Sequence, residues 1–285
     1  MAANSAGSAA PAWYEIQNAR EVPSPALLVY PERIRRNIDA MIRIAGSPDR
    51  LRPHIKTHKT AEIIQMQRER GIDRFKCATI AEAELLGSLG AGDILLAYQP
   101  VGPDQERLLR LQAAYPGVRF AALVDHEETL KALGELATSH NAQIRLYLDL
   151  NTGMDRTGIV PGAAAAALYR KIAAHPHLEA CGLHAYDGHN RQTDTSERQA
   201  AADKAFEGVA KLRDQLVSEG LDVPAIIAGG SPSFPMHAYR EGVELSPGTT
   251  LLWDARYQSL FPDMPFEIAA VLLTRVVSHP GEQYG

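Results

Sequence analysis

The chain has 285 residues and a mass of 31.0 kDa, enough for one large α/β barrel or for two smaller domains. Its formal net charge of −5 argues against the broadly basic surface of a nucleic-acid-binding protein. No apolar run approaches a membrane span, and the N-terminus lacks the features of a signal peptide, so we expect a cytoplasmic protein. Cys77 and Cys181 lie in apolar runs without metal-ligand spacing, which predicts buried free thiols and no zinc site.

Short apolar runs alternate with longer amphipathic stretches, the order typical of a parallel sheet with helical crossovers. The expected strands are residues 26–30, 51–57, 74–79, 93–99, 119–125, 143–150, 178–186 and 225–230. The expected helices are residues 32–45, 61–71, 81–92, 104–115, 127–140, 162–174 and 196–219. This pattern predicts a (β/α)8 TIM-type barrel. A doubly wound open sheet is the alternative, although the Gly-x-Gly-x-x-Gly fingerprint expected after its first strand is missing.

The pattern changes after Ser231. Residues 234–252 are irregular, and residues 266–278 are typical of one or two antiparallel strands. We therefore expect three parts: an N-terminal tail and lead-in (1–22), the barrel (23–250) and the start of a truncated C-terminal β domain (251–285).

The segment Arg-Pro-His-Ile-Lys-Thr-His-Lys (52–59) concentrates imidazoles and amines at the end of an expected strand. Alternation along a strand would place Lys56 on one face with His54 and His58. Cationic or desolvated surroundings lower the pKa of an amine and make it a nucleophile toward carbonyls. The alternative is a basic surface turn that binds phosphate or nothing.

Two further motifs follow expected strands. The segment 149–158, DLNTGMDRTG, is not a calcium loop, because it lacks the required glycine and has Val160 at the position of the bidentate glutamate. It either delivers Arg156 to a pocket or is a turn with a surface arginine. The segment Gly229–Ser233, GGSPS, can form a phosphate nest, although turns use the same residues.

The segment 182–189, GLHAYDGH, places two imidazoles and a phenol at another strand end. His184 and Tyr186 share a face of the expected strand, and His184 is as readily a structural residue as a functional one. His189 lies beyond the strand in a loop and is the better acid–base candidate.

Taken in order, these motifs resemble the fold-type III pyridoxal-phosphate enzymes, and within them the D-threonine aldolase and D-serine dehydratase group. The barrel of that group is related to the alanine racemase N-terminal domain. The matching segments run from Pro23 to Val277 and include SPALLVY, RPHIKTHK, KCATIAEAELL, DLNTGMDRTG, GLHAYDGH, GGSPS and LSPGTTLLWD.

The resemblance implies a role for each candidate residue. Lys56 would form the Schiff base with pyridoxal phosphate, and His54 would support the cofactor ring. Arg156 would face the phenolic edge of the ring and Tyr186 its pyridine nitrogen. The residues that would hold the phosphate are Gly230, Ser231 and Ser233.

The implied reaction is retro-aldol cleavage of a D-configured β-hydroxy amino acid to glycine and an aldehyde, with His189 as the base. The stretches 76–86 and 95–103 favour an aldolase over a D-serine dehydratase. An amino-acid racemase and a protein that binds the cofactor without turnover remain alternatives. The group is also expected to be homodimeric.

One departure concerns a metal. The group carries a divalent metal on a His-x-Cys or His-x-Asp pair in its C-terminal β domain, and His279 stands in no such pair. We therefore expect no metal ligands within this sequence. Either it is a fragment whose metal ligands lie beyond residue 285, or the protein has lost the metal.

Overall fold

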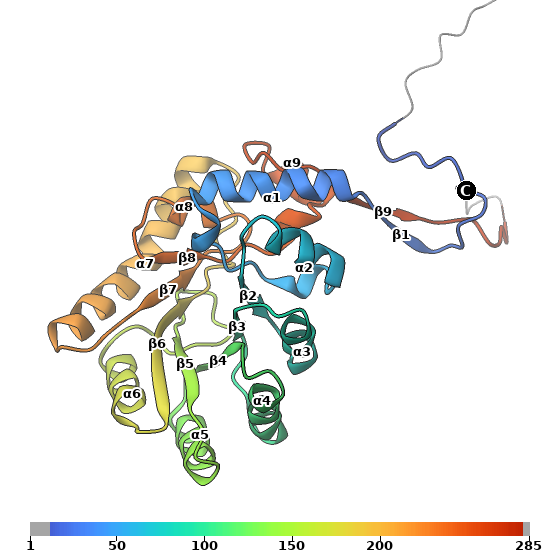
Figure 1. The fold of residues 1–285 in the computed structure, drawn as a ribbon. Helices are drawn as coiled ribbons and strands as arrows, with labels where there is room; N and C mark the ends of the chain where they lie inside the picture. The colour runs from blue at the N-terminus through green and yellow to red at the C-terminus, as the bar shows by residue number, and fades with distance from the viewer. Residues whose placement is uncertain (1–11, 282–285) are drawn as a thin grey trace, which may run out of the picture.

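Seven parallel strands form one curled sheet at the centre of the molecule, as the computed structural model shows in Figure 1. The structure describes residues 12–281. Each strand pairs with its neighbours in chain order, so the parallel barrel-type architecture is confirmed. The strands are β2 (Arg74–Cys77), β3 (Asp93–Leu96), β4 (Arg119–Val124), β5 (Ile144–Asp149), β6 (Leu178–Ala185), β7 (Ala225–Ala228) and β8 (Val243–Leu245).

The crossover helices lie on the outside of the curled sheet (Figure 1). All seven expected helices are present, each ending within a few residues of its predicted bounds. They are α1 (Pro31–Ala45), α2 (Ala61–Arg68), α3 (Ile80–Ser88), α4 (Pro103–Ala114), α5 (Glu127–Ser139), α6 (Ala163–Ala174) and α7 (Thr195–Ser218). Shorter helices follow at α8 (Phe234–His237) and α9 (Ala255–Leu260). Local capping sets several starts: the Asp194 side chain accepts a hydrogen bond from the Glu197 amide at the start of α7.

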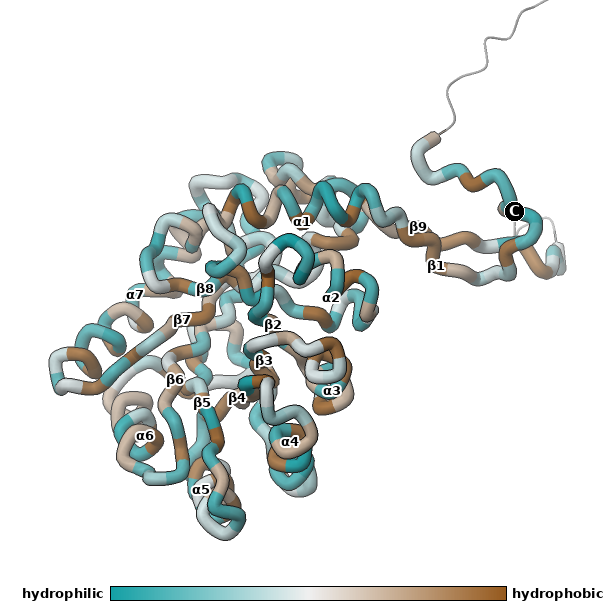
Figure 2. Tube along the Cα trace, viewed as in Figure 1, coloured by the Kyte–Doolittle hydropathy of each residue, from teal (hydrophilic) through white to brown (hydrophobic). Residues whose placement is uncertain are grey.

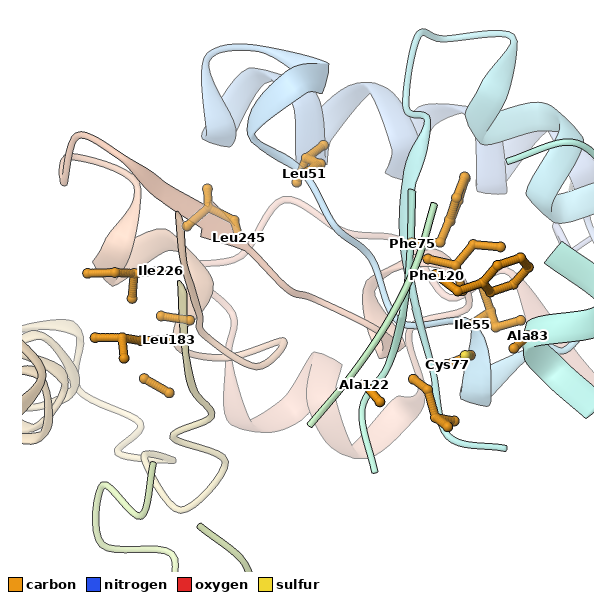
Figure 3. Packing of buried hydrophobic residues seen from close by; sticks show 14 of the residues in the cluster. Leu51, Ile55, Phe75, Cys77, Ala83, Phe120, Ala122, Leu183, Ile226 and Leu245 are labelled. Carbon is orange, nitrogen blue, oxygen red and sulfur yellow. The ribbon is translucent and has the colours of Figure 1, made fainter. Parts of the chain in front are cut away.

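The strands are apolar on both faces, and the two faces form separate clusters. Residues facing outward pack against the helices in a large cluster that includes Phe75, Phe120 and Leu183 (Figure 3). Inward-facing residues form a smaller cluster inside the sheet: Leu95, Ala121, Leu123, Tyr147, Cys181 and Ile227. Apolar contact on both faces explains why these strands are continuous hydrophobic runs in the sequence.

The prediction of a strand over residues 51–57 is wrong for its second half. Residues Ile55–Thr57 form a 3-10 turn (η2), and the Nδ1 atom of His54 accepts a hydrogen bond from the Lys56 amide at its start. Pro53 has no amide hydrogen, so a regular strand ladder cannot run through this segment. The predicted alternation of His54, Lys56 and His58 on one strand face is therefore also wrong.

The first half of the same segment takes the place of the missing barrel strand. Leu51 bridges Leu245 of β8, and His54 bridges Lys76 of β2, both in parallel register. Residues 51–54 thus connect the two edges of the seven-stranded sheet and close the barrel.

A buried guanidinium fixes this closure. The Arg52 side chain is 1% exposed and lies between two strands, with Nη1 2.6 Å from Oδ1 of Asp93 and Nε bonded to Glu244. Arg119 and Arg145 also pair with Asp93. These charges lie at the N-terminal ends of the strands, away from the strand ends where a barrel carries its site.

Two further predictions about strands need correction. Residues 26–30 do not belong to the parallel sheet: β1 (Ala26–Val29) pairs antiparallel with β9 (Ala270–Leu273) in a separate two-stranded ribbon. Hydrophobic residues run along both of its strands in Figure 2. Conversely, β8 lies within the region expected to be irregular, because a strand of three residues is too short to show a period.

The predicted domain bounds at residues 22 and 250 stay predictions. Residues 1–11 of the expected tail and residues 282–285 of the expected β domain lie outside the described part of the chain. Between Ala12 and Gly281, no helix combines the length and apolar character needed to cross a bilayer.

Asp93→Ala is expected to lower the free energy of unfolding by about 3–5 kcal/mol, because Arg52 would lose a buried partner. Burial alone would raise the pKa of Asp93, but Arg52 and Arg145 hold it below its ordinary value. Its contribution to stability is therefore present at neutral pH and is lost as the pH falls through the acid range.

Urea denaturation at pH 7 and in acid measures both effects. The exposed Asp214→Ala serves as the control and should cost no more than about 1 kcal/mol. Equal losses for the two variants would contradict the structural role of Asp93.

Candidate active site

A cavity of about 500 Å³ opens at the C-terminal ends of the parallel strands. Its volume is in the usual range for pockets that bind small molecules and cofactors. Side chains from the closing segment and from most strands line it: His54, Lys56, Lys76, Ala78, Ala97, Tyr98, Gln99, Val101, Leu123, Asp125, Asp149, Arg156, Thr157, His184 and Tyr186.

Lys56 lies at the mouth of this cavity on the 3-10 turn, and its side chain is exposed. Partial desolvation, together with the nearby Arg156, lowers the pKa of its amine. His54 is buried beside it, and burial with the charges of Lys76 and Lys56 lowers the pKa of the imidazole far below its ordinary range. His54 is therefore neutral at physiological pH.

The ring of Tyr186 is the shared wall of the cavity. The Nζ atoms of Lys56 and Lys76 lie 5.7 Å and 5.3 Å from its centroid, and the Arg156 guanidinium carbon lies at 5.2 Å. Glycines allow this packing: a Cβ atom at Gly188 would lie 2.4 Å from the Tyr186 hydroxyl oxygen. The structure thus brings together four predicted site residues, His54, Lys56, Arg156 and Tyr186, around one cavity.

Lys76 is the side chain that sequence reasoning missed as a site residue. It is 3% exposed on β2, and its Nζ lies 3.3 Å from Nε2 of His184. Nδ1 of His184 in turn lies 2.6 Å from Oδ1 of Asp149. The sequence feature that points to Lys76 is its position inside the apolar run RFKCAT, because a buried lysine needs a partner or a function.

The GGSPS loop lies beside Tyr186, but its groups are not free as a simple phosphate nest requires. The Ser233 hydroxyl accepts the Gly230 amide at 2.9 Å and donates to the buried Asp187 at 2.7 Å. Asp187 also accepts from His237 and Asn190. Gly230 and Ser233 therefore hold the loop in shape.

Ser231 has a different environment. Its hydroxyl oxygen accepts hydrogen bonds from the amides of Gly248 and Thr249, at 3.1 Å and 2.8 Å. Gly248 also packs closely on His54, since a Cβ atom there would lie 3.3 Å from the His54 Cβ. Gly248 and Thr249, which the sequence reasoning did not select as site residues, thus supply two adjacent amides near the cavity.

The structure does not bring His189 to the cavity of Lys56. Its side chain is exposed and lines a separate groove with Asn151, Gly153 and Lys204. A turn at Gly188 and His189, closed by the hydrogen bond from the Asn190 amide to the Asp187 carbonyl, carries His189 into this groove. The structure therefore places the predicted base in a groove separate from the Lys56 cavity, and its catalytic role stays a prediction.

A known protein family matches most of this chain. Residues 29–255 match the family described as alanine racemase, N-terminal domain. The chain belongs to this family. It is thereby a member of the fold-type III pyridoxal-phosphate enzymes, and the resemblance seen in the sequence is confirmed.

Several relatives of this alanine racemase-type barrel have named activities. The chain is 28% identical to a 3-hydroxy-D-aspartate aldolase of Paracoccus denitrificans over 272 residues, covering 91% of this chain and 70% of the relative. It is 25% identical to a D-threo-3-hydroxyaspartate dehydratase of Delftia sp., covering 91% and 69%. The solved D-threonine aldolase from Filomicrobium marinum is 30% identical with a TM-score of 0.82, covering 88% and 69%.

Ser233→Ala is expected to loosen the glycine–serine loop, because the Gly230 amide loses its acceptor and Asp187 loses a donor. The cost should be about 1–3 kcal/mol of stability, with faster hydrogen exchange over residues 229–234. Ser218→Ala, at the exposed end of α7, is the matched control and should change stability by less than about 0.5 kcal/mol. Unchanged exchange in the loop would show that Ser233 does not shape it.

Proposed function

We propose that this protein is a pyridoxal-phosphate-dependent lyase that cleaves the Cα–Cβ bond of D-configured β-hydroxy amino acids. The observation that carries the proposal is Lys56 at the mouth of a cavity of about 500 Å³, in a chain whose relatives include aldolases of this type. The products would be glycine and an aldehyde.

The residues present fit this cofactor. An aldehyde needs an accessible amine of lowered pKa, and Lys56 supplies one. A phosphate needs hydrogen-bond donors, and the Ser231 hydroxyl can donate its O–H while its oxygen accepts the amides of Gly248 and Thr249. An aromatic ring needs flat walls, and Tyr186 presents its face to the same cavity.

We assign the roles as follows. Lys56 would hold the aldehyde carbon of the cofactor covalently, and the neutral His54 would support its ring. Arg156 holds a negative oxygen of the ring or of the substrate carboxylate, because its guanidinium is always charged. Ser231, held by the amides of Gly248 and Thr249, would donate to the phosphate, and Gly230 with Ser233 would fix the loop that presents it. When bound, pyridoxal phosphate supplies the electron sink for the bond that breaks.

A divalent metal would supply a Lewis acid for the β-hydroxyl of the substrate, but the described residues do not fit one. No group of three or more His, Cys, Asp or Glu side chains within residues 12–281 is arranged to hold one. Assays with and without added Mn²⁺, and with a chelator, test this part separately.

We further propose a homodimer as the working unit. The β1–β9 ribbon and the segment after it expose apolar side chains that the same surface of a second copy would cover: Leu27, Val29 and Leu272 on the ribbon, and Val276 and Val277 beyond it. Sedimentation equilibrium tests this. A cytoplasmic location is also proposed, on the support of two buried cysteines that are both free thiols.

Elimination is the second candidate function, because a dehydratase is among the relatives. Incubation with D-threonine, 3-hydroxy-D-aspartate and D-serine separates the candidates. Glycine with acetaldehyde or glyoxylate supports the lyase, and ammonia with a keto acid supports the dehydratase. Neither product from any substrate, with cofactor bound, would refute both and leave a cofactor-binding protein.

Lys56→Ala is expected to abolish the visible absorbance band of the reconstituted protein and its turnover, because the cofactor loses its covalent attachment. Lys171→Ala, a substitution of a surface lysine paired with Glu127, should retain both. A colourless wild-type protein after reconstitution would contradict the role of Lys56.

His189→Ala should retain most of the turnover, because His189 lines a different groove. Loss of a true general base costs about 10²–10⁴-fold in rate. Steady-state kinetics on the same substrate distinguish the two, and a loss of that size would restore His189 as the base.

A further inference from the structure

Asp149, His184 and Lys76 form a chain of hydrogen bonds across the inside of the barrel. Asp149 and His184 face each other on the paired strands β5 and β6, and Lys76 reaches them from β2 on the other side of the cavity. The distances are 2.6 Å between Asp149 and His184, and 3.3 Å between His184 and Lys76. All three residues are at most 5% exposed.

The charges of Asp149 and His184 fix the direction of these bonds. Burial would raise the pKa of Asp149, but the His184 contacts hold it below its ordinary value, so the carboxylate is ionised. Burial and the nearby Lys76 lower the pKa of His184, so the imidazole is neutral. An ionised carboxylate can only accept, so His184 donates Nδ1–H and keeps its lone pair on Nε2.

This tautomer determines how Lys76 is oriented. Its amine must donate one N–H to Nε2 of His184, which directs the remaining positions of the nitrogen toward the cavity and Tyr186. When the amine is neutral, its lone pair is among those positions, and the amine can accept a proton from a bound molecule.

We propose that Lys76 is a second acid–base amine of the cavity, distinct from Lys56, and that His184 and Asp149 are its positioning residues. The inference rests on the proposed lyase function, because it gives Lys76 the proton transfer that the sequence assigned to His189. Neutral Lys76 takes the proton of the substrate hydroxyl and becomes an ammonium as the aldehyde forms. It later returns a proton to the glycine carbon, so the amine ends neutral and the protons balance.

The electrostatic surroundings agree with a base that works near neutrality. Burial, followed by the charge of Lys56, lowers the pKa of Lys76 from 10.5 to about 7. The opposing influence is Asp149, which raises it. The groups that face Lys76 from the surrounding elements are His54, Lys56, Arg52, Asp149, Arg156, His184 and Tyr186.

Nuclear magnetic resonance of the ¹⁵N-lysine-labelled protein tests the proton affinity without using activity. In the cofactor-free wild type, one Nζ resonance should titrate near pH 7, and it should vanish in Lys76→Met. Asp149→Asn should lower the pKa of this resonance, because the negative charge of Asp149 raises it. Lys56→Met should raise the pKa, because the positive charge of Lys56 lowers it. A resonance that titrates near the ordinary lysine value of about 10.4 would overturn the proposal.

Kinetics of the reconstituted enzyme test the role in the reaction. Lys76→Met should lower kcat by about 10²–10⁴-fold with little change in KM, while the cofactor absorbance band remains. In the wild type, kcat should fall as the pH drops below about 7, since the amine is then protonated. In Asp149→Asn, this fall in kcat should begin at a lower pH.

Two controls separate the possible failures. Lys171→Met, at an exposed position, should leave the rate and the profile unchanged. If Lys76→Met does not fold, His184→Gln keeps the amine, removes its aligned acceptor and should still lower kcat. If the wild type is active, and kcat and its fall at low pH are unchanged in Lys76→Met and His184→Gln, only this inference is overturned. An inactive wild type with cofactor bound overturns the proposed function and the catalytic role of Lys76 together.

Discussion

The closure of the barrel by residues 51–54 is the constraint on which the site depends. These residues hydrogen-bond to β8 on one side and to β2 on the other, and the buried Arg52 ties them to Asp93 and Glu244. The 3-10 turn that carries Lys56 follows directly. The position of the amine is therefore set by ion pairs at the opposite end of the barrel, which cannot rearrange without exposing a buried guanidinium.

The excess of positive charge in the cavity explains the lowered pKa of both lysine amines. Lys56, Lys76 and Arg156 surround one tyrosine ring, while Asp149 is the one buried carboxylate among the lining residues of the described chain. Three cations cannot all keep their protons in so small a space, and the guanidinium holds its proton most strongly. The pKa values of the two amines are therefore lowered, which favours a nucleophile and a base.

The sequence predicted the barrel because buried parallel strands and their crossover helices carry strong periodic patterns. It failed where local hydrogen bonding overrides the apolar pattern: Pro53 and the His54 cap convert the end of a predicted strand into a turn. It also failed where a strand is as short as β8, or where a strand leaves the sheet, as β1 does.

The candidate site was predictable only in part, for the same reason. Lys56, Arg156 and Tyr186 follow strands, and strand ends meet at one edge of a parallel sheet, so their convergence follows from topology. Lys76 lies within a strand, and only the pairing of β2 with its neighbours shows that its side chain points inward. The direction of His189 depends on one turn, which no periodicity encodes.

Burying Lys76 has a thermodynamic consequence that favours a functional role. Because its pKa is about 7 in the folded chain and 10.5 otherwise, the unfolded state binds more protons between these values. The burial therefore destabilises the fold at neutral pH, and this penalty disappears only as the pH rises toward 10.5. A methionine or leucine at this position would fill the space without that cost, and the neighbouring strands offer many examples of such apolar packing. A lysine retained there, and aligned by a neutral histidine and an ionised aspartate, is explained by the proton it can exchange with the cavity.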